Sequence, residues 1–129
     1  MTRALGLVLL SAVTLSPVRA GEPVALFDGK DRSRWYTFLR DHGRDKDPNG
    51  TFAVKDGVLR ISGQDFGGLA TRDEYANYEA AVEYAWGGKV WPGRDKTARD
   101  SGLILHATGS DGAVSKSWLE GFQLSLIHI

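Results

Sequence analysis

Sixteen glycines divide this chain into short apolar or alternating runs, and that spacing constrains the fold more than any other feature. No segment shows the periodicity of a long amphipathic helix, and neither a heptad nor an internal repeat occurs. Short runs bounded by turn residues are typical of β-strands. The sequence therefore predicts an all-β domain, either a two-sheet sandwich or a jelly roll.

The clearest predicted hairpin lies in residues 51–62. Residues 51–54 and 58–62 flank Lys55-Asp56-Gly57, and Asp-Gly favours a tight turn. Upstream, the aromatic-rich residues 35–39 precede a charged segment, residues 40–50, that is typical of a surface loop.

Three further strands are predicted downstream. Residues 77–86 alternate, with tyrosine and tryptophan on one face, although a helix is the alternative because alanine and glutamate favour helices. Residues 101–107 carry apolar side chains on both faces, which favours a central strand. Residues 118–123 begin one more strand.

The first twenty residues have the three parts of an export signal. Arg3 supplies a positive charge, residues 4–15 are apolar but too short to span a bilayer, and Val18-Arg19-Ala20 places small residues at the cleavage position. We expect cleavage after Ala20 and a secreted or periplasmic protein with no membrane segment left. A retained anchor is the alternative.

The composition of the mature chain excludes some partners. Without Arg3 and Arg19 the chain has 14 basic and 16 acidic residues, a net charge of −2 over 109 residues. A net charge this close to zero, and slightly negative, gives no basic surface that would attract nucleic acid or an anionic membrane. There is no cysteine, so stability depends on the core alone. The oligomeric state is not predicted.

The last six residues, 124–129, read LSLIHI. They can be encoded by CTG TCT CTT ATA CAC ATC, the mosaic end of a transposase adapter used in DNA sequencing. An ordinary apolar strand is the alternative. We interpret the segment as a non-native tail, which makes residues 21–123 a partial domain.

No local motif indicates a metal or a nucleotide. HExxH, cysteine clusters, EF-hand loops, P-loops and GxSxG elbows are all missing from the sequence. No metal ligand is therefore predicted. A divalent cation would need ligands scattered along the chain, so the cofactor is left open.

His106 is the first candidate for chemistry. A lone histidine in an apolar strand is by default structural, but in a sugar site its ring can act as a base near neutral pH. Asp100 and Glu120 are the candidate polar partners, with turn capping and an exposed strand carboxylate as their structural alternatives. The three residues form the predicted catalytic set.

Four blocks of the sequence resemble the 3-keto-disaccharide hydrolase domain family, once catalogued as a domain of unknown function. They are LFDGKDRSRWY, FAVKDGVLRISG, GGLATRDEYANYEAAVEYAW and DSGLILHATGSDGAVSKSWLEGFQ, in that order within residues 24–123. The resemblance implies a concanavalin-A-like jelly-roll β-sandwich with a sugar site on its concave sheet. It also implies that Asp100, His106, Glu120 and Gln123 lie on strands facing that site.

The resemblance further implies action on glycosides already oxidised at C3. A base would remove the C2 proton, the C1–O bond would break by elimination, and water would then add. Trp118, Gln123 and Lys116 are the predicted substrate-binding residues. The alternatives are a carbohydrate-binding module on the same fold and an ordinary glycosidase with two facing carboxylates.

Overall fold

The computed structural model describes residues 21–126, which contain strands and no helix. The all-β prediction is confirmed for this part of the chain. The predicted signal peptide and residues 127–129 of the predicted tail lie outside the described residues. Within residues 21–126, no helix has the length and apolar character needed to cross a membrane.

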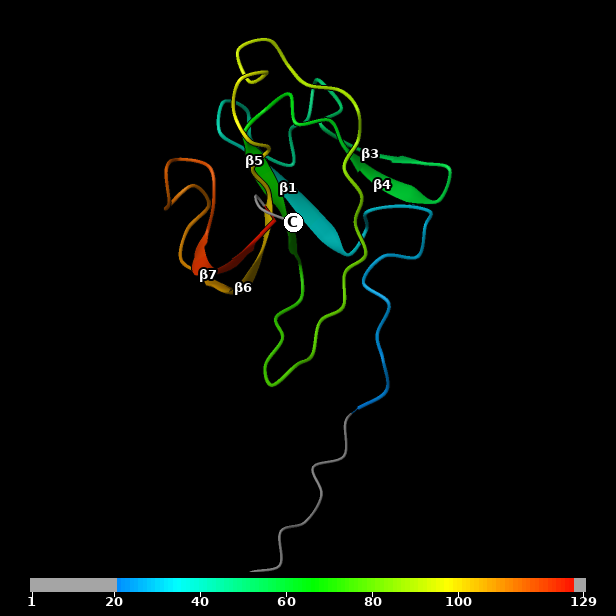
Figure 1. Ribbon diagram of the computed structural model, residues 1–129. Helices are drawn as coiled ribbons and strands as arrows, with labels where there is room; N and C mark the ends of the chain where they lie inside the picture. Colours follow the sequence, from blue (N-terminus) through cyan, green and yellow to red (C-terminus); the bar gives the residue numbers. More distant parts are fainter. Residues whose placement is uncertain (1–20, 127–129) are drawn as a thin grey trace, which may run out of the picture.

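Short antiparallel pairings organise the described chain into three small sheets (Figure 1). The sheets have the strand orders β2-β1-β5, β3-β4 and β6-β7. The strands are β1 (Trp35–Leu39), β2 (Gly43–Arg44), β3 (Phe52–Lys55), β4 (Val58–Ile61), β5 (Gly67–Thr71), β6 (Gly102–Thr108) and β7 (Glu120–Ser125).

The predicted hairpin is confirmed as β3 and β4. Lys55 pairs with Val58, so the turn has two residues, Asp56 and Gly57, one fewer than the sequence suggested. Both turn residues have positive φ, 53° and 75°, as a type I′ turn requires. Aspartate and glycine tolerate that backbone conformation at low steric cost, which explains why this turn was predictable.

The core lies on β1 and at the start of β3. Leu39 is fully buried, Tyr36 and Phe52 are nearly so, and the buried polar residues Thr37 and Thr51 lie beside them. Gly67 on β5 pairs with Leu39, and a Cβ added to Gly67 would lie 2.0 Å from the Phe38 carbonyl oxygen. The two strands therefore approach so closely that only glycine fits at this position.

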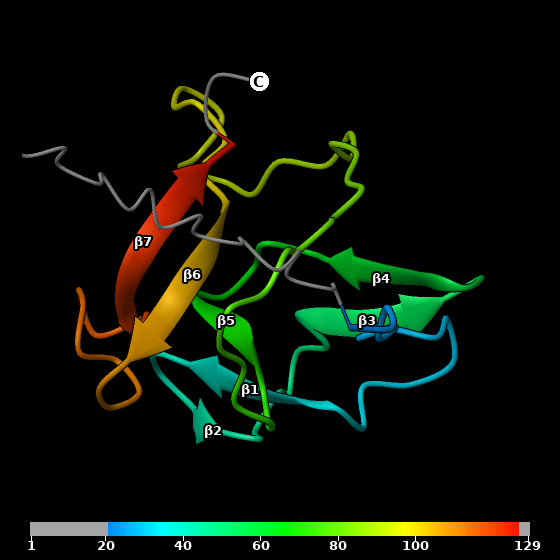
Figure 2. The same ribbon diagram turned by 90° about the horizontal axis from the view of Figure 1, so that it is seen from below.

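The connection between β6 and β7 packs against β1. Tyr36 Oη donates to Asp111 Oδ1 at 3.0 Å, and Arg40 Nε donates to Oγ of the buried Ser117 at 2.7 Å. A Cβ on Gly112 would lie 3.1 Å from the Phe38 ring. These contacts attach the loop that follows β6 to the end of β1, and Figure 2 shows the end of β6 beside that end of β1.

One strand prediction is wrong, and a second is confirmed as a strand, β6, but not in its central position. Residues 77–86 form neither a strand nor a helix, because no segment within residues 21–126 is placed to supply ladder hydrogen bonds, and their side chains are exposed. Residues 101–107 were predicted to be a central strand. In the described part of the chain, however, β6 pairs with β7 alone.

The charged segment at residues 40–50 is also more ordered than a simple surface loop. It contains β2, whose two residues pair with Phe38 and Leu39. Asp45 accepts a hydrogen bond from the Thr37 amide and pairs with Arg72 at 3.1 Å. Charged side chains of this segment thus hold it against β1. Its composition alone did not indicate this structural role.

Candidate functional site

His106 lies at a β-bulge near the end of β6. The register between β6 and β7 shifts between Leu105 and Thr108, and His106 itself has a positive φ of 52°. The left-handed conformation costs a non-glycine residue about 1–2 kcal/mol, and bulges of this kind redirect a side chain. Strained positions of this kind cluster at functional sites, although other non-glycine residues of this chain share the conformation.

Two aromatic rings flank the exposed His106 imidazole. The Tyr78 ring centroid lies 5.3 Å from it and the Phe122 centroid lies 6.4 Å away, the latter edge to face. Tyr78 Oη also accepts a hydrogen bond from the His106 backbone N–H at 3.0 Å. The arrangement fixes the backbone of the histidine and leaves its side chain accessible, which suits either a base or a stacking residue.

Glu120 and Gln123 project from β7 beside glycines. Glu120 lies opposite Thr108, and its carboxyl carbon would be 3.7 Å from a Cβ placed on Gly109. The Gln123 amide occupies the space above Gly102, where an added Cβ would lie 2.5 Å from Nε2. Glu120 is therefore at the His106 end of the β6-β7 ribbon, and Gln123 is nearer the other end.

Asp100 lies at the far end of the ribbon from His106. It precedes β6 and is exposed, and His106 follows it by six positions along a largely extended chain. At about 3.3 Å per residue, the separation is roughly 20 Å. Within residues 21–126, no hydrogen bond or ion pair joins His106 to Asp100 or to Glu120. The structure therefore groups Glu120 with His106 and separates Asp100 from both.

The remaining two predicted residues lie on the loop that precedes β7. Lys116 is exposed with a φ of 58°. Trp118 is partly buried and meets the Phe66 ring edge to face, with the centroids 6.4 Å apart. Trp118 thus packs beside the start of β5, where its Cδ1 would lie 4.0 Å from a Cβ placed on Gly68. For the part of the chain that is described, no group of three or more His, Asp or Glu side chains is arranged to hold a metal ion.

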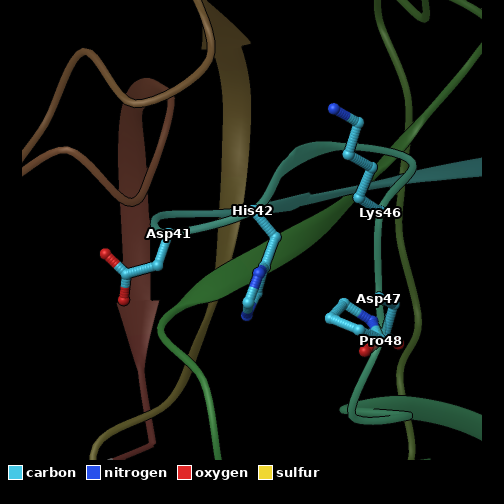
Figure 3. Close-up of a pocket in the computed structure, with 5 residues that line it drawn as sticks. All are labelled: Asp41, His42, Lys46, Asp47 and Pro48. Carbon is cyan, nitrogen blue, oxygen red and sulfur yellow. The ribbon is translucent and has the colours of Figure 1, made fainter.

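A second histidine, His42, was not among the predicted residues. It lies between β1 and β2 and lines a hollow of about 500 Å³, together with Asp41, Lys46, Asp47 and Pro48. In Figure 3 the His42 ring occupies the middle of this group, while Asp41 and Lys46 point outward. In the sequence, His42 lies in a charged segment that is typical of a surface loop. No short motif in that segment indicates which side chain contacts the histidine.

The partner of His42 is Asp65. Nε2 of His42 lies 3.9 Å from Asp65 Oδ1, and both side chains are largely buried, with exposed fractions of 30% and 16%. The buried Thr51 hydroxyl donates to Asp65 Oδ2 at 2.7 Å, and Asn49 Nδ2 donates at 3.1 Å. These hydrogen bonds, from Thr51 first and then Asn49, lower the pKa of Asp65, with smaller contributions from His42 and Arg94.

Two arginines adjoin the same region. The guanidinium carbon of Arg40 lies 4.4 Å from the Phe66 ring centre, and that of Arg94 lies 4.0 Å from it. Cation–π contacts of this length stabilise by about 0.5–1 kcal/mol at exposed sites. Phe66 follows Asp65 directly, so these contacts help to fix the position of the carboxylate that faces His42.

Asp65→Asn is expected to lower the free energy of unfolding by roughly 1 kcal/mol at pH 7, because Thr51 and Asn49 then donate to a neutral group. The folded pKa of Asp65 lies below its ordinary value of 3.8. Its contribution is therefore fully present above pH 3.8 and is lost as the pH falls through the folded pKa. Urea unfolding at a series of pH values measures the difference.

The matched control for that experiment is Asp56→Asn. Asp56 pairs with Arg60 at 3.5 Å on an exposed turn, where an ion pair contributes little. Asparagine also tolerates its positive φ. A loss in Asp65→Asn that equals the control, or that persists unchanged at low pH, would contradict the assigned hydrogen bonds.

The described residues form an all-β domain with one exposed histidine, His106, and one largely buried histidine, His42. The chain belongs to the 3-keto-alpha-glucoside-1,2-lyase-like domain family, whose sequence model matches residues 22–128. The resemblance found from the four sequence blocks is thereby confirmed. No curated protein and no solved structure matches the chain.

Proposed function

We propose that this protein cleaves glycosides that carry a ketone at C3 of the sugar, releasing the group attached at C1. The observation that carries the proposal is the family match, which extends over residues 22–128 and names a 1,2-lyase acting on 3-keto-α-glucosides. We further propose that the described strands belong to a concanavalin-A-like jelly roll, and that the protein is exported after cleavage behind Ala20.

The chemistry of the proposed reaction follows from the ketone. A carbonyl at C3 acidifies the hydrogen on C2, and the leaving oxygen on C1 is β to the resulting carbanion. When a base removes the C2 proton, the electron pair of that C–H bond forms the C1–C2 double bond and the C1–O bond breaks. Water then adds its oxygen to C1 and a proton returns to C2, so that the net change is hydrolysis.

His106 is the residue we propose as the base. Its ring is exposed and its backbone is held by Tyr78, so that it can receive a proton from a substrate seated on the β6-β7 ribbon. A positioned base contributes about 10²–10⁴-fold in rate. Glu120 lies at the same end of the ribbon and is the nearer of the two proposed polar partners, with Asp100 at the other end.

The substrate-binding roles are proposals of the same kind. Gln123 presents an amide above Gly102, a group that can donate to and accept from sugar hydroxyls. Lys116 is exposed on the loop before β7, and Trp118 presents an indole beside Phe66. An indole face stacks well on a sugar ring, so these residues would contact the part of the substrate nearest that loop.

The oxidation state of the substrate tests the proposed function. The protein should cleave 3-keto-trehalose and leave trehalose intact, because only the ketone acidifies the C2 hydrogen. Product release is followed by chromatography, and incorporation of solvent deuterium at C2 is followed by NMR. Equal cleavage of both sugars would assign the protein to the glycosidases with a carboxylate pair. Binding without cleavage would instead indicate a carbohydrate-binding module.

A further inference from the structure

The proposed reaction needs a hydrogen-bond donor beside its base. When the C2 proton leaves, negative charge develops on the oxygen at C3, and stabilising such an oxyanion is usually the largest single contribution to catalysis. The predicted catalytic set contains no group for this purpose beside His106, because Asp100 and Glu120 carry carboxylates, which only accept hydrogen bonds when ionised. The C2 hydrogen and the C3 oxygen are on adjacent carbon atoms, so the donor must lie next to the base.

We propose that the hydroxyl of Tyr78 is this donor and stabilises the enolate oxygen at C3; this inference rests on the proposed function. Two contacts place Tyr78 at the proposed base. Tyr78 Oη lies 3.0 Å from the backbone N of His106, and the centroids of the two rings are 5.3 Å apart. The other ring beside the imidazole belongs to Phe122, which has no polar side-chain atom. Of these two neighbours, only Tyr78 can therefore donate.

The hydrogen bonding of Tyr78 leaves its own proton available to a substrate. Its hydroxyl oxygen accepts from the His106 N–H, and a hydroxyl can donate at the same time as it accepts. Among residues 21–126, no protein group accepts a hydrogen bond from this hydroxyl. Accepting a hydrogen bond also polarises the O–H group, which makes it a better donor. Tyr78 is 37% exposed, so a sugar can reach the hydroxyl from solvent.

The segment that carries Tyr78 is held near both ends of β6. Tyr78 contacts His106 near the end of the strand, and Arg99, which precedes the strand, donates from Nη1 to the Gly87 carbonyl at 2.5 Å. The guanidinium carbon of Arg99 also lies 5.7 Å from the centre of the Trp86 ring. The hydroxyl is therefore in place before substrate binds. A donor held in this way stabilises developing charge without reorganisation during the reaction.

Atoms and electrons balance with Tyr78 keeping its proton throughout. His106 takes the C2 proton, the electron pair of the C–H bond forms a C2–C3 double bond, and the C3–O π pair moves to the oxygen, where Tyr78 donates its hydrogen bond. The pair then returns from the oxygen, the C1–C2 double bond forms, and the C1–O bond breaks. The leaving oxygen takes a proton from water, and the hydroxide that remains bonds to C1. His106 finally returns its proton to C2.

The first test removes the hydroxyl and keeps the ring. Tyr78→Phe should lower kcat for 3-keto-trehalose by about 10²–10³-fold and leave KM nearly unchanged, because the donor acts on charge that develops in the transition state. Exchange of the C2 hydrogen with solvent deuterium should fall by a similar factor, since formation of the enolate itself needs the donor. Steady-state kinetics and NMR measure the two rates.

A second variant distinguishes a donor to the substrate from a residue that only positions His106. With 3-fluorotyrosine at position 78, the hydroxyl becomes a better hydrogen-bond donor and a poorer acceptor. If Tyr78 donates to the enolate, this protein should cleave faster than the wild type at a pH at which the fluorinated phenol stays protonated. If the hydroxyl only accepts from the His106 N–H, cleavage should be slower instead.

Tyr84→Phe is the matched control for the loss of a hydroxyl. Tyr84 lies on the same segment, is 42% exposed and meets the Trp86 ring edge to face, and within residues 21–126 no hydrogen bond or ring contact joins it to His106. This variant should behave as the wild type. The amide 15N chemical shift of His106 should change in Tyr78→Phe and not in Tyr84→Phe. Near-UV circular dichroism checks that both variants keep the fold.

The outcomes separate this inference from the proposed function. A wild-type kcat in Tyr78→Phe, or a raised KM at an unchanged kcat, would overturn the inference and leave the proposed function intact. Cleavage by the 3-fluorotyrosine protein that is equal to or slower than that of the wild type would also overturn the donor role, and this measurement decides if Tyr78→Phe is insoluble. A wild-type protein that does not cleave 3-keto-trehalose would overturn the proposed function and the inference with it.

Discussion

Replacing His106 with alanine is expected to lower kcat/KM for 3-keto-trehalose by about 10²–10⁴-fold, with most of the loss in kcat. The reason is that a base acts in the transition state and contributes little to binding of the ground state. Steady-state kinetics with purified wild type and variant, together with the rate of deuterium exchange at C2, measure the effect. Exchange should fall in parallel with cleavage.

A second variant, His106→Gly, separates the loss of the imidazole ring from the effect of backbone strain. Because the residue has a φ of 52°, glycine at this position relieves strain, whereas alanine retains it. His106→Gly should therefore unfold at a denaturant concentration equal to or above that of His106→Ala and still lack activity. Activity near the wild-type value in His106→Gly would show that the ring only packs against Tyr78 and Phe122.

Gly67→Ala is expected to lower the free energy of unfolding by about 3–5 kcal/mol, the largest loss we expect from a single methyl group in this chain. The added Cβ would lie 2.0 Å from the Phe38 carbonyl oxygen and 2.9 Å from Leu39 Cα and Cδ2. The first two atoms are backbone, and Leu39 is fully buried, so no side-chain rotation can relieve the clash. The pairing of β1 with β5 must open locally. Urea or guanidinium unfolding measures the loss.

Gly88→Ala is the matched control. No heavy atom lies within 4 Å of a Cβ at Gly88, and its φ is not in the left-handed region. The change should stay within about 0.5 kcal/mol. A Gly67→Ala variant as stable as Gly88→Ala would show that β1 and β5 do not approach as closely as the structure has them.

The β3-β4 hairpin was predictable from the sequence, whereas the distance between Asp100 and His106 was not. The Asp56-Gly57 turn was recognisable because its backbone conformation depends on the two residues that form it. The role of Asp100 was harder to assign, because the distance between two ends of a strand does not appear in a motif. His106 and Asp100 are close in sequence, yet an extended chain separates them by roughly 20 Å.

By itself the sequence determined several of the strand-forming segments, the tight turn and the family, because these depend on local backbone preferences and on the order of short motifs. Only the tertiary structure decided which segments pair. It left residues 77–86 without a ladder, although their alternation favours a strand, because ladder hydrogen bonds need a partner that alternation cannot supply. It also placed His42 beside Asp65, since a contact between distant residues forms only when β1 and β5 pair and bring their neighbouring loops together.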